Sequence, residues 1–302
     1  MDSLDTGTIP AGERQAGPQT GEVHGVSGAG LLPATTHTPF IDDVYHSPQH
    51  ETGWFFRLFP ALGFYSRMAK IVYTASRRAD AGDYTGADWA ASSLAILRAM
   101  EATGGALVLE GFDAVRSLAE PCLFVGNHMS SLETFVLPSI IRPYKPVTFV
   151  IKESLQTYPV FGSIMRSCDP ITVGRANPRD DLSAVLDGGM ERLKKGISIV
   201  IFPQSTRAEV FDPSQFNTIG IKLARKAKVP IIPMALRTLF WGNGSLLKDF
   251  GPVRPRSIAH IRFGEPLTVE GNGKQEHERI SAFIQASLAE WEAEEAARVA
   301  AS

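Results

Sequence analysis

Short apolar runs alternate with longer amphipathic segments along most of the chain. The apolar runs are rich in Val, Ile and Phe and have the length of single strands: Ala106–Glu110, Cys122–Val125, Val147–Ile151, Ile197–Phe202, Ile231–Leu236 and Ala259–Phe263. Between them, Asp181–Lys195 and Thr218–Lys228 carry apolar residues at helical spacing. This alternation predicts an α/β fold with a mixed, largely parallel sheet that is flanked by helices.

The two ends of the chain have different patterns. Residues 1–50 are rich in Gly, Thr, Pro and Ser and have few large apolar residues, which predicts a disordered tail. Residues 51–104 predict an N-terminal helical segment before the α/β domain, which we place at 105–270. Residues 271–302 predict a C-terminal helix whose apolar residues form one packing stripe: Ile280, Phe283, Ile284, Leu288 and Trp291.

The segment from Trp54 to Tyr73 is the best candidate for membrane contact. Its aromatic residues alternate with cations, and Pro60 and Gly63 interrupt it near the middle. Rings that enter the lipid interface beside cations that meet anionic headgroups are typical of an interfacial helix. The pattern fits equally a core helix that packs on the main domain, so both interpretations stay open on the sequence alone.

Composition excludes several classes of protein. The 302 residues are 44% hydrophobic and 21% charged with a formal net charge of −2, so no basic excess is available for nucleic acid. Cys122 and Cys168 are the only cysteines, which excludes a disulfide framework and argues against a cysteine-rich metal site. The first 35 residues lack the apolar core of a signal peptide, and no run of 18 apolar residues predicts a spanning helix.

The segment from Phe124 to Thr134 carries the most informative chemistry. An apolar strand ends at a glycine, and His128 follows in the turn before a predicted helix, where α/β folds build sites. A neutral imidazole there can accept a proton from an alcohol, and a carboxylate can hold its other nitrogen. Glu133 can do this only from the first helical turn. The alternative is a capping box from Ser130 to Glu133, in which the carboxylate bonds only backbone.

Three further segments add candidate binding groups. Arg207 ends a polar turn after the strand at Ile197–Phe202, where a guanidinium can hold phosphate through two hydrogen bonds. The commoner fate of such an arginine is a solvated turn. Arg175 ends another apolar run, and the segment Val229–Pro233 brackets a strand with prolines but carries no reactive group.

Taken in order, these segments resemble the glycerolipid acyltransferase family, typified by 1-acylglycerol-3-phosphate acyltransferases, over roughly residues 105–265. The family pairs a histidine with an acidic residue separated by four positions, and His128 and Glu133 match with glutamate for the commoner aspartate. The family next has an arginine block, to which Arg175 corresponds loosely. Its motif Phe-Pro-Glu-Gly-Thr-Arg corresponds to the run from Phe202 to Arg207, and its motif Val-Pro-Ile-x-Pro corresponds to residues 229–233. The resemblance implies substrate-binding roles for Asn127, Arg175, Phe202, Pro203, Gln204, Ser205, Thr206 and Arg207.

The resemblance implies direct acyl transfer without a cofactor or a metal. His128 would deprotonate the hydroxyl of a lysophospholipid acceptor, Glu133 would hold the imidazole, and acyl-CoA or acyl-carrier protein would be the co-substrate. Arg207 and Arg175 would hold the acceptor phosphate, and backbone amides near the helix start would stabilise the oxyanion. Because the family acts at the bilayer surface, the resemblance favours Trp54–Tyr73 as an interfacial anchor. The protein would then be peripheral or monotopic on the cytoplasmic side of a membrane.

One departure from the family pattern bears on the substrate. Gln204 and Ser205 replace Glu-Gly, which removes a carboxylate and puts the acceptor headgroup in doubt. The acceptor could be 1-acylglycerol-3-phosphate, another lysolipid or an amino-acid lipid. The chain could also be a lipid-binding member without catalysis. A hydrolase using Ser130 or Ser131 is disfavoured because the sequence has no G-x-S-x-G motif.

Overall fold

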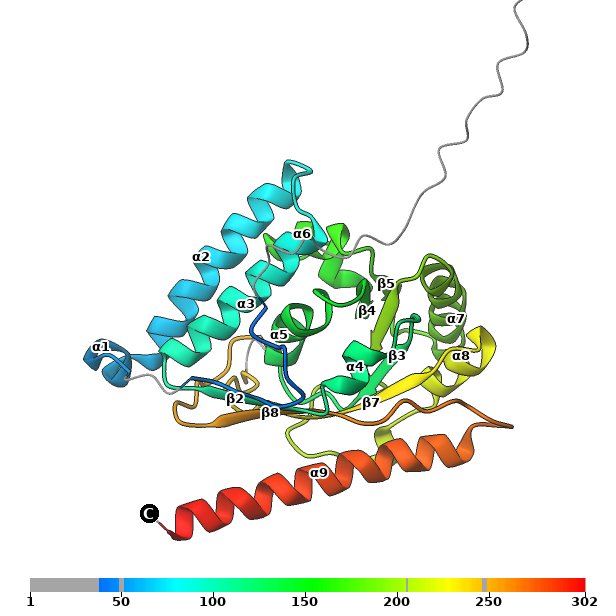
Figure 1. Cartoon of the computed structure of the whole chain (residues 1–302). Coiled ribbons are helices and arrows are strands. Elements are labelled where there is room, and N and C mark those ends of the chain that lie inside the picture. Colours follow the sequence, from blue (N-terminus) through cyan, green and yellow to red (C-terminus); the bar gives the residue numbers. More distant parts are fainter. Residues whose placement is uncertain (1–37, 49–51, 205, 246–248, 302) are drawn as a thin grey trace, which may run out of the picture.

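The computed structural model describes residues 38–48, 52–204, 206–245 and 249–301, and within them eight strands form one sheet (Figure 1). The strand order is β1-β2-β8-β7-β3-β6-β4-β5. Five of the seven neighbouring pairs are parallel, while β1–β2 and β7–β8 are antiparallel, which confirms the predicted mixed, largely parallel sheet. The strands are β1 (Tyr45–His46), β2 (Ala106–Glu110), β3 (Leu123–Gly126), β4 (Val147–Lys152), β5 (Ile171–Val173), β6 (Ser198–Ile201), β7 (Ile231–Arg237) and β8 (Ile258–Phe263).

The apolar runs at the centre of the sheet are strands that are buried on both faces, namely β3, β6 and β7. Successive side chains of a strand point to opposite faces, so Leu123 and Val125 join one hydrophobic core while Phe124 joins the other. In β6 the same alternation sends Ile199 to one core and Val200 to the other. Because helices cover both faces, neither set of side chains has to be polar.

Helices form a layer on each side of the sheet, and Figure 1 shows α2, α3 and α5 on one side and α9 on the other. The first core contains side chains of α2, α3 and α5, and the second contains side chains of α7, α8 and α9. The bounds are α1 (Trp54–Leu58), α2 (Pro60–Asp80), α3 (Gly86–Ala102), α4 (Asp113–Ser117), α5 (Leu132–Ile141), α6 (Phe161–Ser167), α7 (Pro178–Lys194), α8 (Ile219–Ala227) and α9 (Lys274–Ala300), with short 3₁₀ turns at Glu153–Gln156 and Pro213–Gln215.

Residues 38–48 correct the predicted extent of the N-terminal tail. Phe40 is 0% exposed and its ring contacts those of Tyr45 and Phe112 edge-on. The backbone amide of Ser47 also donates to the Leu107 carbonyl at 2.8 Å, and β1 pairs with β2. A single buried aromatic ring and a two-residue strand hold this stretch on the sheet, although its composition is polar. The rest of the predicted tail, residues 1–37 and 49–50, lies outside the described residues.

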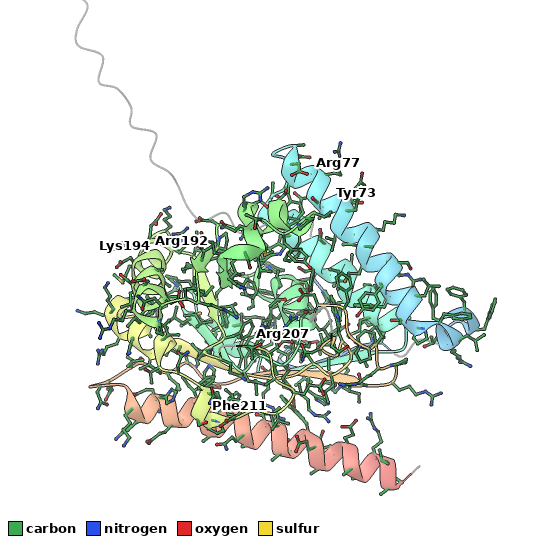
Figure 2. The ribbon with its side chains drawn as sticks, turned by 180° about the vertical axis from the view of Figure 1, so that it is seen from behind. Tyr73, Arg77, Arg192, Lys194, Arg207 and Phe211 are labelled. Carbon is green, nitrogen blue, oxygen red and sulfur yellow. The ribbon has the colours of Figure 1, made fainter. Side chains whose placement is uncertain are left out.

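The segment from Trp54 to Tyr73 forms two helices that meet at Phe59. Pro60 occupies the first turn of α2, where its missing N–H leaves no hydrogen bond unmade. One side of α2 is core, with Phe64 fully buried, whereas Trp54 in α1 is 74% exposed. Figure 2 shows Tyr73 near the far end of α2, and its side chain is also exposed. No helix among the described residues is both long and apolar enough to cross a bilayer.

The parallel strands bring several loop starts to one edge of the sheet. Because β3, β4, β5, β6 and β7 run in the same direction, their carboxyl ends lie along this edge. Strands β3 and β7 approach so closely that a Cβ on Gly126 would lie 2.7 Å from the Met234 carbonyl oxygen. Glycine at the end of β3 therefore allows the chain to turn directly into the segment that carries His128.

Candidate active site

His128 lies in the turn between β3 and α5, as the spacing to Glu133 required. Its Nδ1 is 2.9 Å from Oε1 of Glu133, which occupies the first turn of α5. The imidazole stacks on Phe202, with ring centroids 4.3 Å apart and planes 6° apart. Its side chain is 15% exposed, while that of Glu133 is fully buried. Because Nδ1 faces Glu133, Nε2 is the nitrogen that is left for a substrate.

The Glu133 carboxylate also organises the turn that precedes the helix. Its Oε1 accepts hydrogen bonds from the backbone amides of Met129 at 2.7 Å and Ser130 at 2.9 Å. Its Oε2 accepts from the hydroxyls of Ser130 and Thr238. The carboxylate of Glu133 therefore both caps the start of the helix and pairs with His128. The N-cap residue itself is Ser131, and its side chain makes no capping hydrogen bond.

These donors keep Glu133 ionised in spite of its burial. Burial by itself raises the pKa of a carboxyl group, because the charged form loses its hydration. The hydrogen bond and charge of His128, with the Thr238 hydroxyl and the Ser130 amide, act in the opposite direction and leave the pKa of Glu133 below its ordinary value of 4.5. A negative carboxylate against Nδ1 fixes the proton on that nitrogen and stabilises the imidazolium when Nε2 takes up a second proton.

Gln204 keeps the hydrogen bond that a carboxylate could make at its position. Its side chain is buried, and Oε1 accepts from the backbone amide of His128 at 2.7 Å. The amide of Ala208 donates to the carbonyl oxygen of the same histidine at 2.9 Å, so the turn after β6 holds the histidine from both sides. The substitution relative to the family pattern therefore leaves the hydrogen bonding of this turn complete and removes only the negative charge.

Asn127 directly precedes His128 and holds its strand to a neighbouring one. Its side chain is buried, with Nδ2 donating to the Leu236 carbonyl at 2.8 Å and Oδ1 accepting from the Leu236 amide at 2.9 Å. Both ends of the amide thus bond the backbone of β7. These contacts give Asn127 a structural role, tying the end of β3 to β7, and its substrate-binding role stays a prediction.

The predicted arginines lie in different surroundings. Arg207, near the middle of the molecule in Figure 2, places Nη2 2.8 Å from Oδ1 of Asp249 and donates through Nη1 to the Ser131 hydroxyl. A cavity opens beside His128, and among the described residues Arg175 lines it whereas Arg207 does not. Arg175 adopts a left-handed backbone with φ of 60°, and its amide donates to Asp181 at 3.0 Å.

The remaining residues of the turn after β6 divide by surroundings. Phe202 lines the cavity and stacks on the His128 imidazole, as described above. The Pro203 carbonyl accepts from the side chain of Asn217. Thr206 is exposed, and Ser205 lies outside the described residues. Of this turn, the aromatic ring and the Gln204 amide therefore bear most directly on a substrate.

A cavity of about 500 Å³ opens beside His128 along the carboxyl edge of the sheet. Its lining is largely apolar, with side chains from β4, the Glu153–Gln156 turn, α6 and α7. Three cations also line it: Lys152 at the end of β4, Arg175 after β5, and Lys222 on α8. The combination is suited to a ligand with a hydrocarbon chain and an anionic group.

The sequence prediction missed Lys152, Lys222 and Thr238. Each follows or faces a strand end at the same edge, but only the strand order brings these positions together. Lys152 directly follows the predicted strand at Val147–Ile151, and a cation at a strand end was the signal available for it. Lys222 is one of several polar residues in the predicted amphipathic helix at Thr218–Lys228. Thr238 directly follows β7 but lies two positions beyond the predicted strand at Ile231–Leu236, and it carries no signal of its own.

Three backbone amides near the helix start, where oxyanion donors are expected, are already engaged. The amides of Met129 and Ser130 donate to Glu133, and the Leu132 amide donates to the Ser130 hydroxyl at 3.0 Å. The structure therefore argues against these three amides as oxyanion donors, and a donor elsewhere in the turn stays a prediction. The two serine hydroxyls bond groups other than the imidazole, that of Ser130 to Glu133 and that of Ser131 to Arg207. This geometry gives a serine nucleophile no support.

Comparisons with known proteins agree with this arrangement. The family model described as Acyltransferase matches residues 107–237. A 1-acyl-sn-glycerol-3-phosphate acyltransferase of Pseudomonas aeruginosa is 29% identical over 176 residues, 57% of this chain and 65% of that protein. A chloroplastic 1-acyl-sn-glycerol-3-phosphate acyltransferase of Brassica napus is 31% identical over 139 residues, 46% of this chain and 38% of that protein. The chain thus spans less than two thirds of the length of these relatives.

Solved structures add the fold. The crystal structure of the 1-acyl-sn-glycerophosphate acyltransferase PlsC from Thermotoga maritima matches with a TM-score of 0.56 and 19% identity. The match covers 78% of this chain and 96% of that one, which shows a shared fold. The model described as Acyltransferase matches the part of the chain from β2 to β7 that carries His128 and Glu133, and the relatives named above agree with an acyltransferase.

Proposed function

We propose that the protein is an O-acyltransferase that moves a fatty acyl group from an acyl thioester to the hydroxyl of a lysophospholipid. The acceptor is 1-acylglycerol-3-phosphate and the product phosphatidic acid. The observation that carries the proposal is the His128–Glu133 pair, 2.9 Å apart, at the side of a largely apolar cavity that also holds cations. The names of the Pseudomonas and Brassica relatives support the choice of acceptor.

The proposed reaction needs one proton carrier and no covalent enzyme intermediate. Nε2 of His128 takes the proton of the acceptor hydroxyl as its oxygen attacks the thioester carbonyl carbon. The tetrahedral intermediate collapses, the carbon–sulfur bond breaks, and the thiolate takes the proton from the imidazolium. Glu133 stays ionised throughout and stabilises the imidazolium between the two proton transfers. The ester and the free thiol leave, and the enzyme returns to its starting protonation state.

The cavity lining supports a division between an acyl chain and a phosphate. Phe149, Leu155 and Phe161 are among its apolar walls, and a fatty acyl chain removes such surface from water. Arg175 and Lys222 supply positive charge for the acceptor phosphate, with the opposing charge of Asp181 nearby. We therefore assign the phosphate to Arg175 and its neighbouring lysines instead of to Arg207.

This assignment has a direct test in acceptor kinetics. Arg175→Ala should raise KM for lysophosphatidic acid about tenfold or more and leave KM for an uncharged monoacylglycerol near the wild-type value, since only the first acceptor has a phosphate. Lys222→Ala should act in the same direction. Equal KM changes for the two acceptors would contradict the phosphate assignment.

The exposed aromatic end of the molecule supports work at a membrane surface. Trp54, Leu58 and Leu62 are exposed on α1 and the start of α2, with Arg57 between them. Apolar side chains beside a cation favour the interface of an anionic bilayer. Replacing the three apolar residues by glutamate should abolish sedimentation with phosphatidylglycerol vesicles. The matched control is Val210→Glu at an exposed apolar position elsewhere, which should still sediment. Sedimentation of the triple variant would refute this surface.

The central experiment measures acyl transfer. Purified protein is given oleoyl-CoA, palmitoyl-CoA or acyl-carrier protein donors with a panel of lysolipids, beside His128→Ala and the control His46→Ala. Turnover of lysophosphatidic acid by wild type and His46→Ala that is lost in His128→Ala would support the proposal. Equal turnover by His128→Ala would refute the assigned base. If no donor gives acyl transfer but the protein still binds lysolipid, the proposed catalysis would be refuted in favour of a lipid-binding function.

A further inference from the structure

Thr238 joins the catalytic pair from a distant part of the chain. It directly follows β7, which runs parallel to β3 with Gly126 opposite Met234, so both strands deliver their next residues to the same edge. Its side chain is 0% exposed. The Thr238 hydroxyl donates to Oε2 of Glu133, across 105 positions of sequence.

The two oxygens of Glu133 have different partners. Oε1 accepts from Nδ1 of His128 and from the amides of Met129 and Ser130, all of which belong to the catalytic turn. Oε2 accepts from two hydroxyls, that of Ser130 at 3.0 Å and that of Thr238. The Ser130 hydroxyl also lies 2.9 Å from Oγ1 of Thr238 and accepts from the Leu132 amide. Within the part of the chain that the structure describes, Thr238 is therefore the donor to this carboxylate that comes from outside residues 128–133.

We propose that Thr238 is a positioning residue for acyl transfer, whose hydroxyl fixes the Glu133 carboxylate so that Oε1 stays against Nδ1 of His128. The inference rests on the proposed function of the dyad. The terminal torsion of a glutamate is broad and roughly two-fold, so the side chain by itself does not hold one orientation. The three donors to Oε1 fix the position of that oxygen. The Thr238 hydroxyl, directly after β7, donates to Oε2 and so fixes the plane of the carboxylate group.

The hydroxyl also fills a position that water cannot easily supply. Glu133 and Thr238 are both fully buried and share their surroundings with apolar side chains of α3, β2 and α5, among them Met100, Leu107 and Val136. A carboxylate in such surroundings has no solvent to complete its hydrogen bonds, so loss of a donor leaves the charge under-solvated. The carboxylate then turns toward the remaining donors and no longer holds the imidazole for transfer.

Thr238→Val tests this by removing the hydroxyl while keeping the size of the side chain. We expect kcat to fall about tenfold with KM for both substrates within about twofold, and Thr238→Ser to restore kcat. The matched control is Thr103→Val, which removes a buried hydroxyl that donates to the Ala99 and Met100 carbonyls. It should lower the melting temperature without changing kcat. Thr238→Ala is prepared beside the valine variant, because it leaves space instead of a methyl group beside the carboxylate.

A second measurement does not depend on turnover. The proton on Nδ1 of His128 that is shared with Glu133 should give a far-downfield ¹H resonance, assigned by its absence in His128→Ala. Thr238→Val or Thr238→Ala, whichever is folded by its thermal transition, should shift or broaden this resonance, while Thr238→Ser and Thr103→Val should retain it. Wild-type kcat and an unchanged resonance in a folded Thr238 variant would overturn the inference. Full activity of His128→Ala would instead refute the proposed function, so the two failures are distinguishable.

Discussion

His260 should make the stability of the protein sensitive to mild acid. It lies on β8, is 8% exposed, and stacks on Trp291 of α9 with ring centroids 4.9 Å apart. Burial lowers its pKa most, and the nearby guanidinium groups of Arg237, Arg262 and Arg298 lower it further against the opposing charge of Glu295. Together they bring the pKa of His260 to about 4 from an ordinary value of 6.5. The imidazole is therefore neutral in the folded protein at pH values where it is charged in the unfolded chain.

The sign and size of the effect follow from proton uptake. Between pH 6.5 and 4 the unfolded chain binds a proton at His260 that the folded protein does not, so the free energy of unfolding decreases as pH falls through this range. Above pH 6.5 both states are neutral at this position and the effect disappears. The gap between 6.5 and about 4, at about 1.4 kcal/mol for each pH unit, corresponds to about 3 kcal/mol. About 2.5 kcal/mol of this should be reached by roughly pH 4.5.

His260→Phe isolates this contribution, because it keeps a ring against Trp291 and cannot titrate. Urea unfolding at a series of pH values from roughly 7.5 to 4.5 gives the free energy of unfolding of each protein. The stability of the wild type relative to the variant should fall by about 2.5 kcal/mol toward the acid end. His46→Phe, at an exposed position of β1, should follow the wild type throughout. Parallel curves for wild type and His260→Phe would refute the reasoning.

Three further predictions concern the turn of the catalytic histidine and the N-terminal stretch. Glu133→Gln should lower kcat about a thousandfold, since an amide cannot stabilise the imidazolium; activity within tenfold of wild type would contradict the dyad. In the acyl-transfer assay, Gln204→Glu should keep kcat within about threefold, because a carboxylate can still accept from the His128 amide. Gln204→Ala leaves that amide without an acceptor and should lower kcat at least tenfold. Equal losses in the two variants would contradict the hydrogen-bond argument. Phe40→Ala should lower the free energy of unfolding by about 3–5 kcal/mol in urea titrations, and a loss below about 1 kcal/mol would show that residues 38–48 do not pack as described.

The sequence predicted the centre of the sheet well because the physical signal there is strong. Strands buried on both faces are short continuous apolar runs, and this is the pattern of β3, β6 and β7. Strands β1 and β5 have two and three residues, too few to show periodicity. The burial of Phe40 was missed for a related reason: one aromatic ring in a polar stretch has no repeating pattern around it, and only its tertiary contacts hold it.

The candidate site divides between what is local in sequence and what is not. The spacing of His128 and Glu133 predicted their contact, because five residues are enough to specify a turn that leads into a helix. The surroundings of the two arginines could not be predicted in this way. Arg207 meets Asp249 across a loop, while Arg175 reaches the cavity because β5 lies at the end of the strand order. Such pairings depend on which strands are neighbours, and a single sequence carries no local signal for that.

The Glu133 carboxylate shows why a structural and a catalytic interpretation need not compete. A capping carboxylate and a base-orienting carboxylate are both buried, ionised and supplied with donors, so one side chain in the first turn of α5 satisfies both descriptions. Substitution of Glu133 consequently disturbs the turn and the imidazole together and cannot separate the two roles. Thr238 donates to Oε2, lies 2.9 Å from the Ser130 hydroxyl, and leaves the three donors to Oε1 in place. A loss of kcat in a folded Thr238 variant would thus report the orientation of the carboxylate while the amides of Met129 and Ser130 still bond it.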